Sequence, residues 1–255
     1  MSHHVVEFAD VCYRYPDGTE ALKGVSFRLK HGESVGIVGA NGSGKTTLIL
    51  QANGYLLPTS GQIRIGNLEI SKTTRQEIRK KVGVVFQHTD DQLFMPTVFE
   101  DVAFGPLNLG MSPELVRERV SFALSTVGCQ NLSKKPPHHL SSGQKRSVAI
   151  AAVLAMEPDI LVMDEPSSDL DPKSRRKLIG LLQGFQHTRI IASHDLDLIL
   201  DVCTRTLVIK EGRIVADGPS ADLLFNEELM EENNLELPLS QQRRAGSQQP
   251  GGDRA

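Results

Sequence analysis

Residues 39 to 46, GANGSGKT, combine glycines with a lysine and a threonine at a spacing suited to holding phosphate. The pattern is G-x-x-x-x-G-K-S/T, placed between a strand-like stretch and a helix-like one. Glycines let backbone N–H groups turn toward phosphate oxygens, and a helix start adds free donors and partial positive charge. The predicted nucleotide-phosphate site comprises Gly39, Asn41, Gly42, Ser43, Gly44, Lys45, Thr46 and Thr47.

Two adjacent acids, Asp164 and Glu165, follow the apolar stretch 160–163. Successive side chains of a strand point in opposite directions, so the two carboxylates can serve different targets. Asp164 can face Mg²⁺ together with the Thr46 hydroxyl, while Glu165 orients or deprotonates a water in line with the γ-phosphate. A solvated acidic turn is the alternative. The four apolar residues before the acids favour a buried strand end, where open α/β sheets bind ligands.

The stretch 140–155, LSSGQKRSVAIAAVLA, indicates which class of phosphate-loop protein this chain resembles. The chain has no N-K-x-D segment of the kind that reads guanine. Instead, the stretch resembles the L-S-G-G-Q signature that opens a helix in the ATP-binding cassette (ABC) ATPase family. Further family marks follow in the expected order: Gln87 in VFQ, the turn 168–171, and His194 in IIASHD. The resemblance runs from about residue 5 to residue 224.

The resemblance implies a role for each matching residue. Gln87 touches Mg²⁺ and the attacking water, and His194 contacts the γ-phosphate, so the implied catalytic residues are Glu165, His194 and Gln87. Tyr15 matches the aromatic residue that stacks on adenine, with Tyr13 as its rival and core packing as the alternative. The implied Mg²⁺ ligands are Thr46, Gln87 and Asp164.

The resemblance also implies a head-to-tail dimer around two ATP molecules, in which each signature meets the γ-phosphate of the opposite chain. The signature residues are Ser141, Ser142, Gly143 and Gln144, and the loop crossing the interface contains Ser168, Asp169 and Asp171. From the residues alone, S-S-G could equally be a plain helix cap. Ser142 replaces the usual glycine and is expected to be tolerated, because its hydroxyl can donate. Asp169 stands where a small residue is common.

Strands alternating with helices predict an α/β fold, with a helical block inserted in the middle of the chain. The resemblance implies the ABC ATPase fold: a P-loop NTPase (RecA-like) core, an N-terminal antiparallel β-subdomain and an inserted helical subdomain. We expect the ATPase domain at 1–225, its helical insertion at about 95–157, and an acidic then polar tail at 226–255, partly disordered. The helix after the phosphate loop is expected over 46–56.

Composition and sequence patterns argue against several classes of protein. The chain has 255 residues, 39% hydrophobic and 23% charged, with a net charge of −3, which argues against a nucleic-acid partner. Its longest apolar run, 148–156, is far shorter than the roughly 18–20 residues that cross a bilayer. The N-terminus lacks the pattern of a secretory signal. The distant Cys12, Cys129 and Cys203 suggest neither a disulfide framework nor a zinc site.

The segment 88–112, with DQLF and EDVAFGP, resembles the energy-coupling-factor branch, and SHDLDLILDVC agrees with its cobalt and nickel uptake subgroup. Leu93, Phe94, Met95 and Phe99 are either core or a groove for a short helix of a membrane subunit; the resemblance favours the groove. His3, His4, His88, His138 and His139 lack ligand spacing, so no resident metal site is predicted beyond that for Mg²⁺.

The implied protein is an ATP-hydrolysing motor at the cytoplasmic face of the cell membrane. Its partners would be a second ATPase subunit, most simply a second copy, and integral membrane energy-coupling and substrate-binding subunits. An ATPase of a vitamin or other small-solute importer remains an alternative, because the motor carries no cargo pocket. A soluble cassette protein for DNA or ribosome work is disfavoured by the single cassette and the absence of heptads, and a phosphotransferase by the signature.

Overall fold

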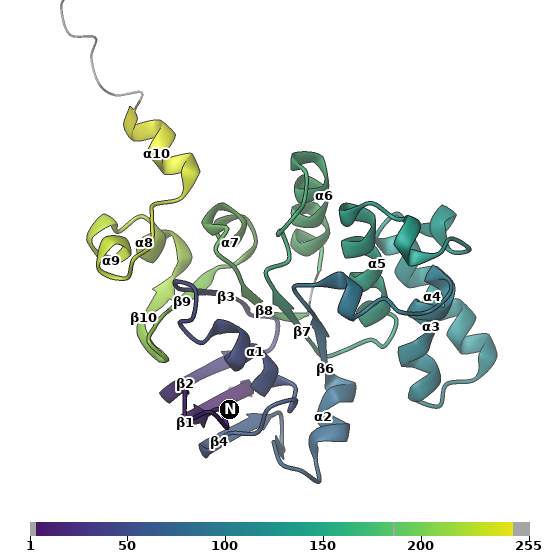
Figure 1. Ribbon diagram of the computed structural model, residues 1–255, viewed down its shortest axis with the longest axis horizontal. Helices are drawn as coiled ribbons and strands as arrows, with labels where there is room; N and C mark the ends of the chain where they lie inside the picture. The colour runs from purple at the N-terminus through teal and green to yellow at the C-terminus, as the bar shows by residue number, and fades with distance from the viewer. Residues whose placement is uncertain (1–3, 186, 247–255) are drawn as a thin grey trace, which may run out of the picture.

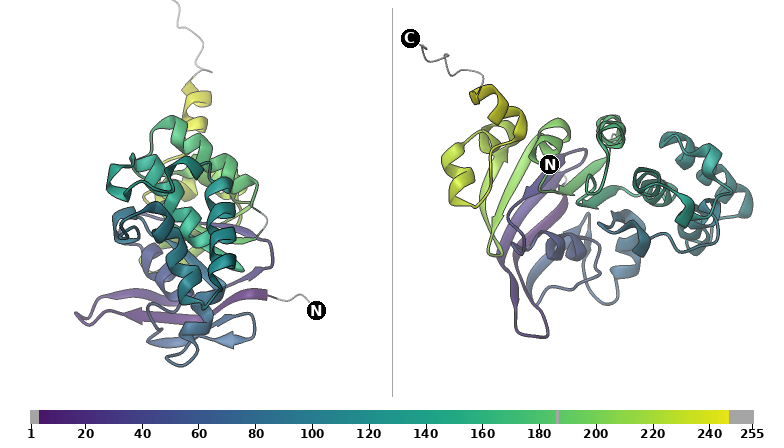
Figure 2. Two further views of the ribbon diagram at one scale, coloured as in Figure 1. Left: turned by 90° about the vertical axis from the view of Figure 1, so that its right-hand side faces the viewer. Right: turned by 45° about the horizontal axis from the view of Figure 1, so that its top comes forward.

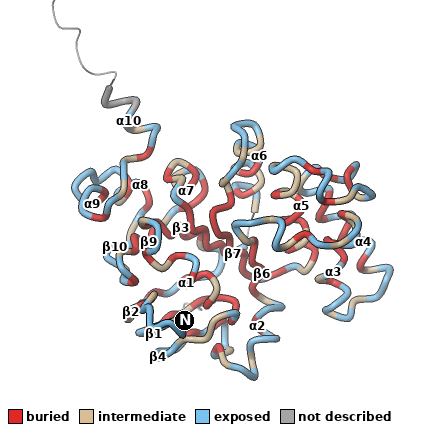
Figure 3. The backbone as a smooth tube through the Cα atoms, in the orientation of Figure 1, coloured by how far each residue is buried: buried red, intermediate tan, exposed pale blue. Residues whose placement is uncertain are grey.

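The computed structural model describes residues 4–185 and 187–246, arranged around two sheets (Figure 1). One is four-stranded in the order β2-β1-β4-β5, and the other is six-stranded in the order β10-β9-β3-β8-β7-β6. Figure 3 shows the buried backbone concentrated in the central strands of the larger sheet. No helix within the described ranges is both long and apolar enough to cross a membrane.

The four-stranded sheet is antiparallel where β1 meets β2 and β4, and where β4 meets β5. The residue pattern of the N-terminus predicts two short strands, at 5–8 and 11–13, but the structure has one continuous strand, β1. A register shift between Phe8 and Val11 lets the strand continue, with Asp10 at a positive φ of 50°. The bounds are β1 (His4–Arg14), β2 (Glu20–Lys30), β4 (Ser60–Ile65) and β5 (Leu68–Glu69).

The six-stranded sheet is parallel except at β10, which pairs antiparallel with β9. Its alternate side chains enter two different hydrophobic clusters: Leu161 and Met163 join one, and Ile160 and Val162 join the other. Apolar cores therefore cover both faces, and polar groups gather at the strand ends. The bounds are β3 (Ser34–Val38), β6 (Val82–Val85), β7 (Ile160–Asp164), β8 (Thr188–Ala192), β9 (Arg205–Lys210) and β10 (Arg213–Pro219).

Helix α1 (Lys45–Ala52) follows β3 and is shorter than the expected 46–56. Asn53 caps it and Gly54, at a φ of 69°, reverses the chain. The inserted helices gather at one side of the molecule (Figure 1), where Ser112 and Ser141 cap two of them through their side chains. The inserted helices are α3 (Val98–Asn108), α4 (Pro113–Thr126) and α5 (Ser142–Leu154). Helix α2 (Arg75–Lys81) precedes them, and single turns lie at Thr89–Asp91, Gln130–Leu132 and Pro137–His139.

The helices after residue 219 lie at the opposite end of the molecule from the inserted ones (Figure 2). The first part of the segment expected as a tail from 226 packs on the protein: Met230 is fully buried, and Leu235 and Leu237 pack on the core. The apolar residues spaced among the glutamates explain the difference. Residues 247–255 of the expected tail lie outside the described residues. The bounds are α6 (Pro172–Gln183), α7 (Leu196–Val202), α8 (Ser220–Leu224), α9 (Glu227–Glu232) and α10 (Leu239–Gly246).

Candidate active site

The phosphate loop connects β3 to α1 and requires glycine at two of its positions. A Cβ at Gly39 would lie 2.6 Å from the Ser43 hydroxyl, and one at Gly44 would lie 2.6 Å from the carbonyl oxygen of Ala21. Gly44 also has a φ of 111°, which L side chains rarely adopt. The loop therefore lies close to neighbouring chain segments, and it leads directly into the N-terminus of α1, where helical N–H groups lack intrahelical partners.

Lys45 lies at the centre of this loop. Its ammonium donates to the carbonyl oxygens of Gly39, at 2.7 Å, and Ala40, at 3.2 Å. Burial lowers the pKa of Lys45, while the nearby carboxylates of Glu165 and Asp164 oppose that shift. The loop thus holds a buried positive charge where phosphate oxygens would bind.

Asp164 ends β7 and is only 5% exposed. Burial raises its pKa, and a hydrogen bond from the Thr46 side chain is the main opposing effect. Its Oδ1 is buried without a hydrogen-bond partner among the described residues. A buried carboxylate oxygen beside a threonine hydroxyl is the donor set that Mg²⁺ prefers, so these residues fit the predicted ion.

Glu165 follows Asp164 and has a positive φ of 45°. The carboxylate accepts hydrogen bonds from the Ser193 hydroxyl and the His194 backbone N–H, each at 3.1 Å. Its Oε2 also lies 2.7 Å from Nδ1 of His194. The carboxyl ends of β7 and β8, which are neighbours in the sheet, bring these groups together.

A cavity of about 720 Å³ unites most of the predicted residues. The Tyr15 hydroxyl lies 3.0 Å from the Thr47 hydroxyl at the cavity wall, and the Tyr13 and Tyr15 rings meet edge to face. Ser43 belongs to the loop, but its buried hydroxyl does not line the cavity. The predicted residues that line it are Tyr15, Gly39, Asn41, Gly42, Gly44, Lys45, Thr46, Thr47, Gln87, Asp164, Glu165 and His194.

The signature residues lie outside this cavity, at the start of α5. Ser141 caps the helix, and the Gln144 side chain accepts from the Ser141 N–H in return. Ser142 is exposed, whereas a Cβ at Gly143 would lie 2.8 Å from Cβ of Ser174 in α6. The signature backbone is thus presented at the surface by two closely packed helix starts.

The loop 168–171 leads from the acids into α6. Asp171 caps that helix, accepting from the backbone N–H groups of Lys173 and Ser174 and from the Ser174 hydroxyl. Asp169 is exposed, with a positive φ of 61°. Asp171 therefore stabilises the start of α6, while the Asp169 side chain is exposed to solvent.

Arg146 is a site residue that the sequence reasoning missed. It is 4% exposed, and its guanidinium donates at 2.7 Å to the carbonyl oxygens of both Phe86 and Gln87. The signature helix is thereby tied to the Gln87 segment. The sequence signal was available, because Arg146 lies two residues before the apolar run of α5 and a buried arginine needs partners.

A family model described as ABC transporter matches residues 22–168, more than half of the chain. The chain belongs to the ABC transporter family. A putative ABC transporter ATP-binding protein of Geobacter sulfurreducens is 60% identical over 242 residues, covering 95% of this chain and 97% of the relative. The energy-coupling factor transporter ATP-binding protein EcfA of Methanocaldococcus jannaschii is 46% identical over 240 residues, covering 92% and 86%.

Solved structures of ABC ATPases also resemble this chain. The structure of cbiO1 from Clostridium perfringens, part of the ABC transporter complex cbiONQ, superposes with a TM-score of 0.81 at 38% identity, covering 96% of this chain and 99% of that one. A post-hydrolysis dimer of the cassette MJ0796 bound to ADP and Pi gives 0.76 at 30% identity, covering 84% and 98%. The predicted ABC ATPase fold is confirmed, and the protein is an ATP-hydrolysing subunit of energy-coupling-factor type.

The ABC ATPase has a second, more apolar cavity of about 690 Å³ between α2, β6 and the inserted helices. Phe94 and Phe104 border it, 60% and 39% exposed, with their rings edge to face. The buried carboxylate of Asp101 accepts from the N–H groups of Phe94, at 2.9 Å, and Met95, at 3.0 Å, and so shapes this edge. Four apolar residues were considered for a groove. Leu93 is buried in the core, Phe99 packs against it and Met95 is half-buried, so Phe94 is the exposed one.

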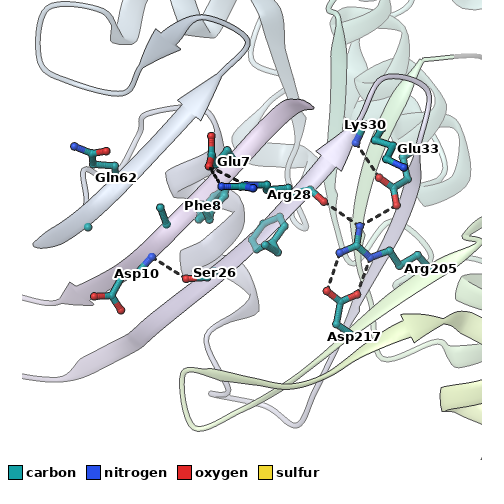
Figure 4. Close-up of a pocket in the computed structure, with 13 residues that line it drawn as sticks. Glu7, Phe8, Asp10, Ser26, Arg28, Lys30, Glu33, Gln62, Arg205 and Asp217 are labelled. Atoms are coloured by element: carbon teal, nitrogen blue, oxygen red, sulfur yellow. Dashed lines mark hydrogen bonds and ion pairs between the residues drawn. The ribbon is translucent and has the colours of Figure 1, made fainter. Parts of the chain in front are cut away.

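A third cavity, about 990 Å³, lies over the four-stranded sheet and is larger than the nucleotide cavity (Figure 4). Five of the charged side chains that line it form ion pairs: Arg205 pairs with Asp217 and Glu33, and Arg28 pairs with Glu7. Arg205 also donates to the Arg28 carbonyl oxygen and so links β9 to β2. This hydrogen bond joins the two sheets of the ABC ATPase, while the ion pairs leave neither Arg28 nor Arg205 as a free charge for a ligand.

Proposed function

We propose that the protein is the motor of an energy-coupling-factor importer that drives the uptake of Co²⁺ or Ni²⁺ through membrane partners. The observation that carries the ATPase part is the cavity in which the phosphate loop, Asp164, Glu165 and His194 meet. The cargo rests on likeness to cbiO1, which is part of the cbiONQ complex. The protein would lie at the cytoplasmic face of the cell membrane, held by its partners.

The working unit is a head-to-tail homodimer around two ATP molecules. Support comes from the position of the signature: Ser142 and Gly143 lie outside the cavity of their own chain and present free N–H groups at a helix start. A second chain that placed its signature against the γ-phosphate would complete the site. Ser168 and Asp169, at the edge of α6, would meet the second chain, and the dimeric cassette MJ0796 offers a precedent.

Hydrolysis follows from the placement of the polar groups. Glu165 accepts a proton from a water, the water oxygen bonds to the γ-phosphorus, and the bond to the bridging oxygen breaks, releasing ADP and phosphate. Lys45 stabilises negative charge on the phosphates, and His194 donates to a γ-phosphate oxygen. Tyr15 stacks on adenine. Thr46, Asp164 and Gln87 would hold Mg²⁺, which would supply positive charge to offset the negative charge of the phosphates.

The cavity bordered by Phe94 and Phe104 receives a short helix of a membrane subunit. Two exposed phenylalanines beside an apolar cavity match the helix-in-groove mode. The groove is coupled to the nucleotide, because Arg146 ties the signature helix to Phe86, which lines the groove, and to Gln87, which lines the nucleotide cavity. Closure around ATP would thus be transmitted to the membrane partner.

Reconstitution tests this function. The protein is co-purified with its membrane partners, placed in vesicles, and assayed for ATP-dependent uptake of Co²⁺, Ni²⁺ and vitamins in parallel. We expect uptake of one of the two metal ions, lost with Glu165→Gln and weakened with Phe94→Ser, which leaves the basal ATPase unchanged. Uptake of a vitamin alone would contradict the cargo. Full assembly of Phe94→Ser with the partners would contradict the groove.

A further inference from the structure

The nucleotide cavity has a wall that none of the phosphate-binding motifs supplies. Asn234 and Leu235, from the segment after α9, line the same cavity as the phosphate loop, Glu165 and His194. We call residues 233–238 the C-terminal strap. Its sequence, NNLELP, carries no nucleotide-binding pattern, and it follows an acidic stretch that by composition would be a tail.

The strap is flanked at each end by a hydrogen bond, one from the end of β9 and one to α7. At its start, the ammonium of Lys210 donates to the carbonyl oxygen of Glu232. Just beyond its end, the N–H of Ser240 donates to Asp197 in the first turn of α7, at 3.3 Å. Because α7 begins directly after His194 and Asp195, the strap runs from the end of β9 to the neighbourhood of His194.

The β9–β10 turn connects the strap to the phosphate loop. Lys210, which holds the strap, is followed by Gly212, whose N–H donates to the carbonyl oxygen of Ser43 at 2.9 Å. A Cβ at Gly212 would lie 2.6 Å from the carbonyl oxygen of Ala21, so this turn fits tightly against the cavity wall. A displacement of the strap would therefore shift the β9–β10 turn and, through it, the loop that binds phosphate.

The strap is built to keep one conformation. Met230 is fully buried, and the Asn233 side chain, 5% exposed, donates to the carbonyl oxygen of Leu229 at 2.7 Å. Asn234 has a positive φ of 54°, a conformation that asparagine adopts more readily than most residues. The N–H of Leu235 donates to the carbonyl oxygen of Met230 at 2.8 Å. This turn places an amide side chain and an aliphatic one at the cavity.

We propose that the strap forms part of the ATP site at its γ-phosphate end. Asn234 supplies a hydrogen bond to the bound triphosphate, and Leu235 excludes water beside His194. The inference rests on the ATP-binding activity and is independent of the dimer, the membrane partners and the cargo. It assigns to the acidic C-terminal region a direct part in nucleotide affinity.

Two variants test the side chains without disturbing the turn. Asn234→Gly removes the amide and keeps the positive φ, which glycine adopts freely. Leu235→Ser removes the apolar wall. In a Glu165→Gln background, at a protein concentration where sedimentation shows single chains, calorimetry measures the Kd for ATP and for ADP. We expect ATP affinity to fall about threefold to tenfold in each variant, with a smaller fall for ADP.

Controls separate the possible outcomes. Glu236→Ala, on the same strap but outside the cavity, should bind ATP normally. Lys45→Ala should lose ATP affinity; if it does so while both strap variants bind ATP as the parent does, the strap proposal is overturned and the phosphate loop stands. An equal loss for ATP and ADP would overturn the γ-phosphate placement. If a variant does not fold, hydrogen exchange on the unaltered chain decides, because ATP must protect residues 233–238 more than ADP does.

Discussion

Glu165 and His194 are joined by a 2.7 Å contact between Oε2 and Nδ1, although Glu165 is 8% exposed and His194 is 66% exposed. The Glu165 carboxylate also accepts the backbone N–H of His194. The group proposed to activate water is thus held by the histidine proposed to sense the γ-phosphate. Phosphate binding by His194 would redirect its ring and free the carboxylate to act on water.

Glu165→Gln should abolish turnover and preserve ATP binding. The amide can still meet His194 and Ser193 but cannot accept a proton from water, so we expect phosphate release to fall about 10²- to 10⁴-fold. Steady-state phosphate release and a nucleotide titration measure the two effects separately. Unimpaired hydrolysis in this variant would rule out Glu165 as the base.

Lys45→Ala should weaken ATP binding about 10- to 100-fold, because charge-assisted contacts to phosphate oxygens are lost. Burial lowers the pKa of Lys45, which means that its charge is costly in the folded protein. We therefore expect the variant to remain folded, with a Tm close to that of the parent chain. Nucleotide titration and thermal unfolding on the same sample give both values. Unchanged affinity would remove Lys45 from the phosphate site.

Asp164→Asn should stabilise the nucleotide-free protein near neutral pH and remove the Mg²⁺ dependence of ATP affinity. Burial raises the pKa of Asp164 above its ordinary 3.8, so the folded chain binds this proton more tightly than the unfolded chain. The free energy of unfolding of the parent chain therefore falls as pH rises from the ordinary value of 3.8 through the raised pKa of Asp164. Thermal unfolding against pH should show the gain of Asp164→Asn shrinking as pH falls below the raised pKa. A pH-independent difference would contradict this account.

Gly143→Ala should impair hydrolysis while leaving ATP binding to the single chain intact. The new Cβ would crowd Ser174 and push α5 from α6, an overpacking that costs about 1–3 kcal/mol. Ser142→Gly at the exposed neighbouring position is the matched control and should behave as the parent. Adding Ser174→Gly to Gly143→Ala should restore hydrolysis, and a failure to restore it would show that the clash is not the cause. Phosphate release at several protein concentrations reports the effect.

Local sequence patterns were enough to predict the phosphate loop and the acid pair, because each is contiguous and its neighbours along the chain set its conformation. Gly39 to Thr47 need only a strand before them and a helix after them, and both are legible as residue patterns. The order of the ABC marks was likewise enough to predict the fold, which the family match and the solved neighbours confirm.

Contacts between residues far apart in the chain follow only from the tertiary structure. Arg146 reaches the carbonyl oxygens of Phe86 and Gln87 about sixty positions away, and Asn234 joins the wall that contains Lys45. The exposure of Phe94 and the burial of Leu93, one residue apart, also follow only from packing. These features depend on which surfaces meet, and an apolar or charged residue type does not specify its partner. The acidic segment that was expected to be a tail lines the cavity instead, because burial of Met230 packs this segment against the core.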